Sequence, residues 1–569
     1  MTKSANIETT AEAYLELLAA RGIDYFFANA GTDFAPIVEA YARRAAHGQT
    51  LPRPLTIPHE ATAVAMAHGY TMVTGRAQAV MLHVIVGAAN GLAGVINAAR
   101  ANVPMLFSAG RNPITEQGFR GSRNRQIHWA QESFDQGAMV REFVKWDYEL
   151  RNFAQLETVV DRALALSHSE PQGPVYLTLP REVLAEKQDV FEYSDPSRLP
   201  VVSPLVTDGD SIAEAARILA AAKNPVVIVK ALGRDPLAVP SLVALAETLG
   251  AGVFDQFHTY VNFPQDHPLH VAFDVQPYLE SADAIVVIES DVPWFPALKN
   301  PSRDARIIHV GVDPLFSRYP IRGFPGDLAL AGHPRLTLRA LTDAVTPLVD
   351  KTAVAERRQR WHAEHTKLRT AWASTAREAS SRTPIEMSWL SRCIGDVMDD
   401  RTIVVNEYDL DATQTCFTTP GTYFLSPSSS ALGWGLGAAL GTKLAAPDKT
   451  VICCVGDGAY IFGAPTASHF VARAYDLPAL FVVFNNRTWN AVKRSVTSYA
   501  SDGWAVKTDV MPLTALEPAP DYEMICQACG GYGERVEDPA KLPDALARAL
   551  KVVRDEKRQA LLNVICRKP

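Results

Sequence analysis

The chain has 569 residues, which is too long for one hydrophobic core and predicts three or four domains. Hydrophobic residues make up 47% and charged residues 21% of the chain, a balance that excludes a disordered protein. The net charge of −7, with no basic arm or stripe, argues against nucleic acid as a partner. No apolar run of about 18 residues occurs, so we expect no membrane span.

The first 22 residues predict a capped amphipathic helix. They contain no apolar core of the kind that a secretory signal needs. The seven cysteines are an odd number for a disulfide framework, so we expect a reduced, cytoplasmic setting.

Residues 1–190 alternate buried strands with helices. The apolar runs that predict parallel strands are Ile23–Phe27, Ala79–Leu82, Pro104–Phe107 and Pro174–Leu177.

Three residues stand out where such strands end. Gly31 lies in a turn that permits close backbone approach, Glu60 begins a helix of small residues, and His83 follows Leu82. Glu60 could be a first-turn glutamate favoured by the helix dipole, and His83 could be structural.

A proline-rich linker at Tyr193–Leu205 leads to a second alternating unit, residues 200–345. Its predicted strands are Pro225–Val229, Ala284–Ile288 and Arg306–Val310. Lys230 and Arg234 flank a glycine turn after the first of these, and Asp313 follows the third. Paired cations beside such a turn suit a diphosphate, although a βα turn with surface charges would look the same.

A charged, helix-prone stretch at Asp350–Arg382 leads to the third unit, residues 383–569. There, a strand ends in Gly456-Asp457-Gly458, and the next strand along the chain ends in Asn485-Asn486. A parallel arrangement brings both turns to one edge of the sheet, where α/β proteins bind ligands. One carboxylate and one amide oxygen suit Mg²⁺ or Ca²⁺ carrying a diphosphate. The alternative is an ordinary βαβ unit.

The GDG and NN turns, with a strand, a helix and a strand between them, resemble the metal-diphosphate motif of thiamine diphosphate enzymes. The resemblance implies that Asp457, Asn486 and the backbone carbonyl of Thr488 bind Mg²⁺. It also places the remaining first-turn residues, Gly456, Gly458 and Ala459, at the diphosphate.

Two further segments resemble the same family. The segment HEATAVAMAHGY is similar to the one whose glutamate bonds to the pyrimidine nitrogen, here Glu60. The segment SSSALGWGLG is similar to the one whose apolar residue bends the cofactor, here Leu432. The turn NAGTD resembles the glycine turn beside the thiazolium, which implies a cofactor contact at Gly31.

The whole chain resembles the acetolactate synthase, benzoylformate decarboxylase and oxalyl-CoA decarboxylase branch of that family. This implies an α/β fold of three doubly wound parallel-sheet domains: pyrimidine (1–190), middle (200–345) and diphosphate (383–569). In that branch the pyrimidine domain of one chain faces the diphosphate domain of another. A dimer is therefore the minimum, and a dimer of dimers is expected.

Within the branch the chain is most like 2-hydroxyacyl-CoA lyases, which release formyl-CoA and a ketone or aldehyde. The resemblance implies catalytic roles for Glu60, His83 and Lys493, and an ADP or CoA site at Lys230, Arg234 and Asp313. Lysis needs a base, yet residues 485–501 contain no acid, so His83 or Lys493 would have to serve. The alternatives are a 2-oxo acid decarboxylase or acetolactate synthase-like carboligase, and a non-catalytic relic that binds the cofactor.

Overall fold

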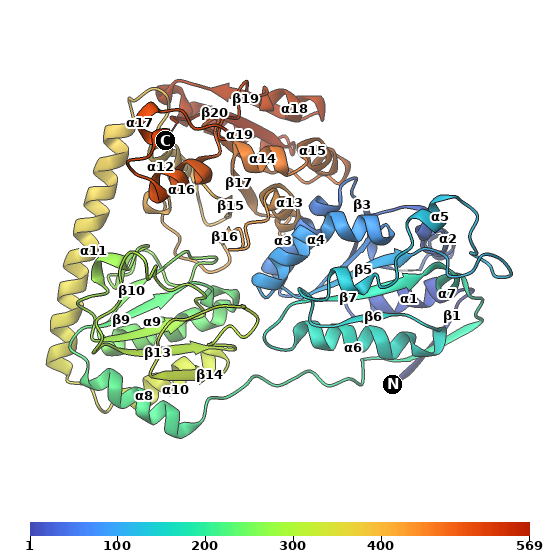
Figure 1. Ribbon diagram of the computed structural model, residues 1–569, viewed down its shortest axis with the longest axis horizontal. Helices are drawn as coiled ribbons and strands as arrows, with labels where there is room; N and C mark the ends of the chain where they lie inside the picture. The colour runs from blue at the N-terminus through green and yellow to red at the C-terminus, as the bar shows by residue number, and fades with distance from the viewer. Residues whose placement is uncertain (50, 569) are drawn as a thin grey trace.

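Three six-stranded parallel sheets follow one another along the chain, each flanked by helices (Figure 1). The computed structural model describes residues 1–49 and 51–568. The expected fold class, three doubly wound α/β units, is confirmed. Short 3-10 helices connect the larger elements at Thr32–Phe34, Gly137–Met139, Phe153–Gln155, Leu232–Arg234, Pro236–Ala238, Gln276–Tyr278, Ala412–Gln414 and Pro539–Lys541.

The N-terminal domain has the strand order β3-β2-β4-β5-β7-β6. Its strands are β2 Tyr25–Asn29, β3 Arg53–Thr56, β4 Ala79–Leu82, β5 Met105–Arg111, β6 Asp147–Glu149 and β7 Pro174–Pro180. Its helices are α1 Thr10–Ala20, α2 Ala35–Ala46, α3 Glu60–Thr74, α4 Val84–Arg100, α5 Ile127–Ala130, α6 Leu156–His168 and α7 Arg181–Ala185. The four predicted strands therefore lie at β2, β4, β5 and β7.

The first residues differ from the expected helix. Strand β1, Thr2–Asn6, pairs antiparallel with β8, Val190–Ser194. Helix α1 begins only at Thr10, after Thr9, whose side chain accepts a hydrogen bond from the Glu12 backbone amide. Helical periodicity did not reveal the strand because its partner lies at the other end of the domain.

The middle domain has the strand order β11-β10-β9-β12-β13-β14. Its strands are β9 Pro225–Val229, β10 Gly252–Phe254, β11 His270–Ala272, β12 Ala284–Ile288, β13 Arg306–Gly311 and β14 Leu328–Ala331. Its helices are α8 Gly209–Ala221, α9 Val239–Leu249 and α10 Pro334–Val345. The 29-residue helix α11, Lys351–Ala379, then runs along the outside of the molecule to the C-terminal domain (Figure 1).

The C-terminal domain has the strand order β16-β15-β17-β18-β20-β19. Its strands are β15 Thr402–Glu407, β16 Tyr423–Leu425, β17 Thr450–Gly456, β18 Leu480–Asn485, β19 Tyr532–Val536 and β20 Ala560–Ile565. Its helices are α12 Met387–Val397, α13 Trp434–Ala445, α14 Asp457–Phe462, α15 Pro465–Ala474, α16 Asn490–Tyr499, α17 Trp504–Thr508, α18 Tyr522–Ala528 and α19 Leu542–Arg554.

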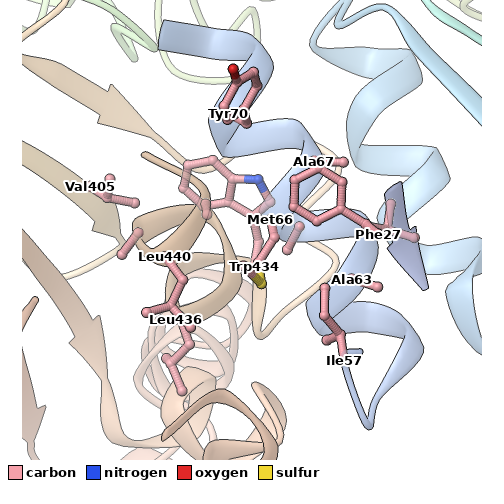
Figure 2. Close-up of a cluster of buried hydrophobic side chains, with 14 of the residues drawn as sticks. Phe27, Ile57, Ala63, Met66, Ala67, Tyr70, Val405, Trp434, Leu436 and Leu440 are labelled. Carbon is pink, nitrogen blue, oxygen red and sulfur yellow. The ribbon is translucent and has the colours of Figure 1, made fainter. Parts of the chain in front are cut away.

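Helices α3 and α13 join the N-terminal and C-terminal domains through a tightly packed contact. A Cβ atom at Gly441 of α13 would lie 1.9 Å from the carbonyl oxygen of Met66, and one at Gly69 of α3 would lie 2.1 Å from that of Ala438. The two helices therefore touch through their backbones, which only residues without side chains permit. Figure 2 shows the apolar side chains of both domains around this contact, with Trp434 against Met66.

None of the helices in residues 1–49 and 51–568 is both long and apolar enough to cross a membrane.

Candidate active site

The carboxyl ends of β17 and β18 bring Asp457 and Asn486 together. The two strands are hydrogen-bonded neighbours, and Asp457 is the first residue of α14. One carboxylate oxygen of Asp457 accepts from its neighbour Gly458 N at 2.9 Å, and the other accepts from Arg487 N at 2.6 Å. The Asn486 side-chain oxygen accepts from Thr488 N at 3.0 Å. The predicted strand–turn–helix–strand–turn order is therefore present, and the backbone holds both side chains in place.

A second carboxylate, which the sequence analysis did not single out, lies beside Asp457. Asp409 follows β15, the neighbour of β17, and a Cβ atom at Gly456 would lie 2.3 Å from its carboxylate. Burial raises the pKa of Asp457 to about 6. Burial and the charge of Asp457 raise the pKa of Asp409 to about 7. A nearby positive charge would stabilise the ionised form of both carboxyl groups. Arg494 of α16 supplies part of that charge to Asp409.

These residues fit a hard divalent cation. The oxygens predicted to bind such an ion are the carboxylate of Asp457, the amide oxygen of Asn486 and the backbone carbonyl of Thr488, and all three residues are buried. Oxygen donors with few charges suit Mg²⁺. Gly456 ends β17, and Gly458 and Ala459 lie in the first turn of α14, the end of a helix that favours a phosphate.

Glu60 follows β3 and His83 follows β4, the two strands that flank β2 in the N-terminal domain. Glu60 is the first residue of α3, and its carboxylate accepts from the Asn90 side chain of α4 at 2.5 Å. His83 immediately precedes α4, and its Nδ1 lies 2.5 Å from Oδ1 of the buried Asp33. A Cβ atom at Gly31 would lie 2.1 Å from His83 Nδ1, so only glycine allows this approach.

The electrostatics of this cluster depend on Asp33. The hydrogen bond from His83 to Asp33 raises the pKa of His83 above its ordinary value of 6.5, and the negative charge of Glu60 raises it further. Burial of His83 lowers the pKa, but by less. The other carboxylate oxygen of Asp33 accepts from Val84 N at 3.3 Å. Val84 has a φ of 37°, a strained value for a β-branched residue, at the turn that places His83. The segment NAGTD drew attention to Gly31 in the sequence, but the role of Asp33 was missed.

Leu432 lies half-buried two residues before the start of α13 and packs against the shared core. The buried Glu407, at the end of β15, accepts from the backbone N–H groups of Gly433 at 2.8 Å, Trp434 at 3.3 Å and Gly435 at 2.7 Å. Burial raises the pKa of Glu407 to about 7. A side chain distant in the sequence thus fixes the turn that carries Leu432, and no local pattern revealed it.

The cations expected to bind a diphosphate in the middle domain are paired with carboxylates. Lys230 forms an ion pair with Asp291, and Arg234 lies 3.2 Å from Glu289. Asp313 accepts from the Ser317 backbone and hydroxyl, each at 2.8 Å. A cavity of about 450 Å³ between this domain and the N-terminal domain is lined by Arg234 and Glu289, among others. Lys230 does not line it, so the structure does not bring the two cations together around one anion.

Lys493 lies in the first half of α16, shortly after the Asn486 turn, and is half-exposed. Its role toward a substrate stays a prediction. Within the described residues, no hydrogen bond or ion pair joins the Glu60 and His83 cluster to Asp457 or Asn486 of the same chain.

Comparison with known proteins gives matches along the whole chain. Three domain families match: "Thiamine pyrophosphate enzyme, N-terminal TPP binding domain" at residues 8–139, "Thiamine pyrophosphate enzyme, central domain" at 212–341, and "Thiamine pyrophosphate enzyme, C-terminal TPP binding domain" at 407–564.

Relatives with named activities cover most of the chain. A sulfoacetaldehyde acetyltransferase of Rhodobacter capsulatus is 26% identical over 95% of this chain and 92% of its own. The benzoylformate decarboxylase of Pseudomonas aeruginosa is 26% identical over 86% of this chain and 88% of its own. Acetolactate synthase isozyme 3 large subunit of Escherichia coli is 24% identical over 88% of this chain and 86% of its own.

Solved structures show the same fold over its full length. The thiamine diphosphate-dependent 4-hydroxybenzoylformate decarboxylase of Rhodococcus jostii RHA1 is 23% identical, with a TM-score of 0.78 over 99% of both chains. The benzoylformate decarboxylase of Polynucleobacter necessarius is 20% identical, with a TM-score of 0.79 over 99% of both chains. With all three domains matched in order, this chain belongs to the thiamine pyrophosphate enzyme family.

Proposed function

We propose that this enzyme uses thiamine diphosphate and Mg²⁺ to break or form the carbon–carbon bond beside the carbonyl of a small 2-oxo acid. The sequence resemblance favours a 2-hydroxyacyl-CoA lyase, and that hypothesis now takes second place. The observation that carries this choice is the pairing of Lys230 with Asp291 and of Arg234 with Glu289. A CoA diphosphate would compete with these carboxylates for both cations, and displacing the buried Asp291 from Lys230 would leave its charge uncompensated.

The relatives support the same choice. Their printed names describe decarboxylases, acetolactate synthases and acetyltransferases. Reactions of the first two kinds start from a 2-oxo acid, and they need no base for a substrate hydroxyl. This removes the difficulty that residues 485–501 contain no acid.

Thiamine diphosphate, when bound, supplies a carbon nucleophile and an electron sink. Asp457, Asn486 and the Thr488 carbonyl would hold Mg²⁺ on its diphosphate, and Leu432 would support its bend. The Glu60 carboxyl would exchange a proton with the pyrimidine nitrogen, held in position by Asn90.

His83 would act on the substrate through Nε2. Asp33 is a carboxylate acceptor, so Nδ1 carries a hydrogen and Nε2 is the ring nitrogen left for a ligand. The raised pKa increases the protonated fraction, in which Nε2 donates a hydrogen bond. A substrate carboxylate or carbonyl oxygen is the acceptor that such a donor would bind.

The active site would be complete only in a dimer, because the two clusters lie on different domains and, among the residues that the structure describes, no hydrogen bond or ion pair joins them. Large apolar side chains are exposed on the consecutive helices α14 and α15 of the C-terminal domain. They include Phe462 of α14, 61% exposed, and Phe470 of α15, 49% exposed. Isolated exposed apolar residues are ordinary, but a group of them on adjacent helices marks an interface. A dimer of dimers is the expected assembly, and the molar mass in solution tests it.

The function is tested by supplying the purified enzyme with thiamine diphosphate and Mg²⁺ and measuring two products. We expect CO₂ from aliphatic or aromatic 2-oxo acids, and no formyl-CoA from 2-hydroxyacyl-CoA esters. Calorimetric titration with CoA and with ADP should show no saturable binding. Release of formyl-CoA together with saturable CoA binding would support the 2-hydroxyacyl-CoA lyase hypothesis and contradict our proposal. Exchange of the thiazolium C2 hydrogen no faster than in free cofactor would instead indicate a non-catalytic relic.

A further inference from the structure

The turn formed by residues 428–431 lies between β16 and α13 and immediately precedes Leu432. Its backbone is bent, because Ser430 has a φ of 53° in the left-handed region. Such a conformation persists only where its surroundings hold it. The surroundings here are Tyr408 of the same domain, whose hydroxyl donates to Ser430 Oγ, and side chains from two other domains.

The first of them is Asn97, in the last turns of α4 in the N-terminal domain. Its amide nitrogen donates to the Ala431 carbonyl at 2.9 Å, and its oxygen accepts from Ala431 N at 3.2 Å and from Ser429 Oγ at 2.6 Å. Asn97 is only 1% exposed. One side-chain amide therefore satisfies both backbone groups of the residue that precedes Leu432.

The second is Lys230, which follows β9 in the middle domain. Its Nζ lies 2.5 Å from Ser428 Oγ and contacts the buried Asp291. The Lys230 carbonyl accepts from Thr259 N at 3.0 Å and from the Asn262 side chain at 2.7 Å. Hydrogen bonds therefore hold both the backbone and the ammonium group of Lys230. The ammonium group in turn holds the Ser428 hydroxyl in one position.

We propose that Asn97 and Lys230 are positioning residues that fix Leu432 beneath the cofactor, with the 428–431 turn as the element that they hold. Glu407 holds the backbone on the other side of Leu432, so the leucine lies between two fixed points. The inference rests on the proposed function, in which Leu432 supports the bend of thiamine diphosphate. It also gives Lys230 a role in place of the diphosphate contact expected from the sequence.

The consequence is that the N-terminal and middle domains contribute to the geometry of a site whose metal end lies in the C-terminal domain. A displacement of about 1 Å in a group that orients reacting atoms can cost on the order of 100-fold in rate. Loosening the 428–431 turn should therefore slow the chemistry at the cofactor without abolishing its binding, because Asp457 and Asn486 are unaffected.

The test compares Ser428→Ala and Asn97→Ala with the control Ser374→Ala, whose hydroxyl lies on the exposed face of α11. Ser428→Ala removes only the contact to the turn and leaves the Lys230–Asp291 pair intact, so no buried charge is created. Two quantities are measured: amide hydrogen exchange of residues 428–435 in the cofactor-free protein, and C2 hydrogen exchange of the cofactor at saturating thiamine diphosphate and Mg²⁺.

We expect faster amide exchange in the turn for both variants, and C2 exchange slowed by roughly 10-fold or more in Asn97→Ala and less in Ser428→Ala. The control should match the parent enzyme in both. If Asn97→Ala is too unstable, Ser429→Ala removes one of the three Asn97 contacts and serves in its place.

A merely structural role would lower the unfolding temperature or the bound fraction while leaving the C2 exchange rate per bound cofactor unchanged, and that result overturns the inference. Failure of the parent enzyme to bind or exchange would instead refute the proposed function, so the two failures are distinguishable.

Discussion

His83 Nδ1 and Asp33 Oδ1 lie 2.5 Å apart, at the ends of the neighbouring strands β2 and β4. The pair directs the imidazole by engaging one of its nitrogens, and it favours the protonated ring. Because Asp33 is only 2% exposed, its charge is weakly screened, and His83 is its nearest ionisable partner.

Replacing Asp33 with Asn should lower the pKa of His83. The hydrogen bond to Asp33 is the main cause that raises this pKa, so the stabilisation is fully present below the ordinary value of 6.5 and is lost as pH rises through the raised value. We expect Asp33→Asn to reduce stability at pH 5 to 6 more than at pH 8, and to move the histidine limb of the pH–rate profile to lower pH. NMR titration of the ring measures the shift. Asp343→Asn on the exposed face of α10 is the control. If the histidine limb of the pH–rate profile does not move in Asp33→Asn, Asp33 does not control the pKa of His83.

Replacing Glu60 with Gln should reduce turnover by roughly 100- to 10,000-fold, the range of a lost proton-transfer group. Cofactor affinity should change only a few-fold, because Gln keeps an oxygen that accepts from Asn90. Steady-state rates and calorimetry separate the two effects. The exposed Glu39→Gln is the matched control, and turnover that survives in Glu60→Gln would refute the role of this residue.

Replacing Asp457 with Ala should weaken thiamine diphosphate retention in the presence of Mg²⁺ by about 100-fold, because the site loses its charged donor. Chelation of the metal in the parent enzyme should have the same effect, and added Mg²⁺ should reverse it. Equilibrium dialysis measures both. The exposed Asp544→Ala should bind normally; equal cofactor retention with and without chelator would exclude the proposed metal site.

Replacing Gly441 with Ala should lower the free energy of unfolding by about 1–3 kcal/mol, the usual cost of overpacking. The added Cβ would lie 1.9 Å from the Met66 carbonyl, and backbone atoms cannot yield as a flexible side chain can. Gly209→Ala in α8 meets nothing within 4 Å and should be neutral or stabilising by up to about 1 kcal/mol. Denaturant titration compares the two variants, and equal effects would show that the α3–α13 contact is looser than described.

Glu407 should make stability depend on pH near neutrality. Burial raises its pKa to about 7 from 4.5, so its contribution is fully present below pH 4.5 and is lost as pH rises through about 7. The change is on the order of 3 kcal/mol at most. Glu407→Gln should flatten the pH dependence between about pH 4.5 and 7. Thermal unfolding across that range measures the pH dependence of stability, with the exposed Glu39→Gln as control. If the curve for Glu407→Gln runs parallel to that of the parent enzyme, Glu407 is not the titrating group.

Much of the fold was predictable because buried parallel strands carry a local signature. The apolar runs at Ala79–Leu82, Pro225–Val229 and Ala284–Ile288 are the strands β4, β9 and β12. The positions of Asp457 and Asn486 followed from the same logic, since each comes directly after such a run. Strand β1 was missed, because its pairing with β8 leaves no trace in its own five residues.

The partners of the site residues were not predictable. Asp33, Asp409 and Glu407 each act on a group that lies on another element, and nothing in their local sequence marks the contact. Lys230 is an example, because the pattern around it predicts an anion site and gives no sign of its pairing with Asp291. Asp291, the residue that takes up its charge, comes from the end of a neighbouring strand.

By itself the sequence determined the three parallel sheets, the order of the domains and the residues at the turns that contain Asp457 and Asn486. All of these depend on patterns that span a few tens of residues. Only the tertiary structure decided which charges are compensated, which turn each buried carboxylate holds and how closely α3 approaches α13. Those outcomes depend on distances between segments far apart in the chain, and the energy of a buried charge or a close contact is set by such distances.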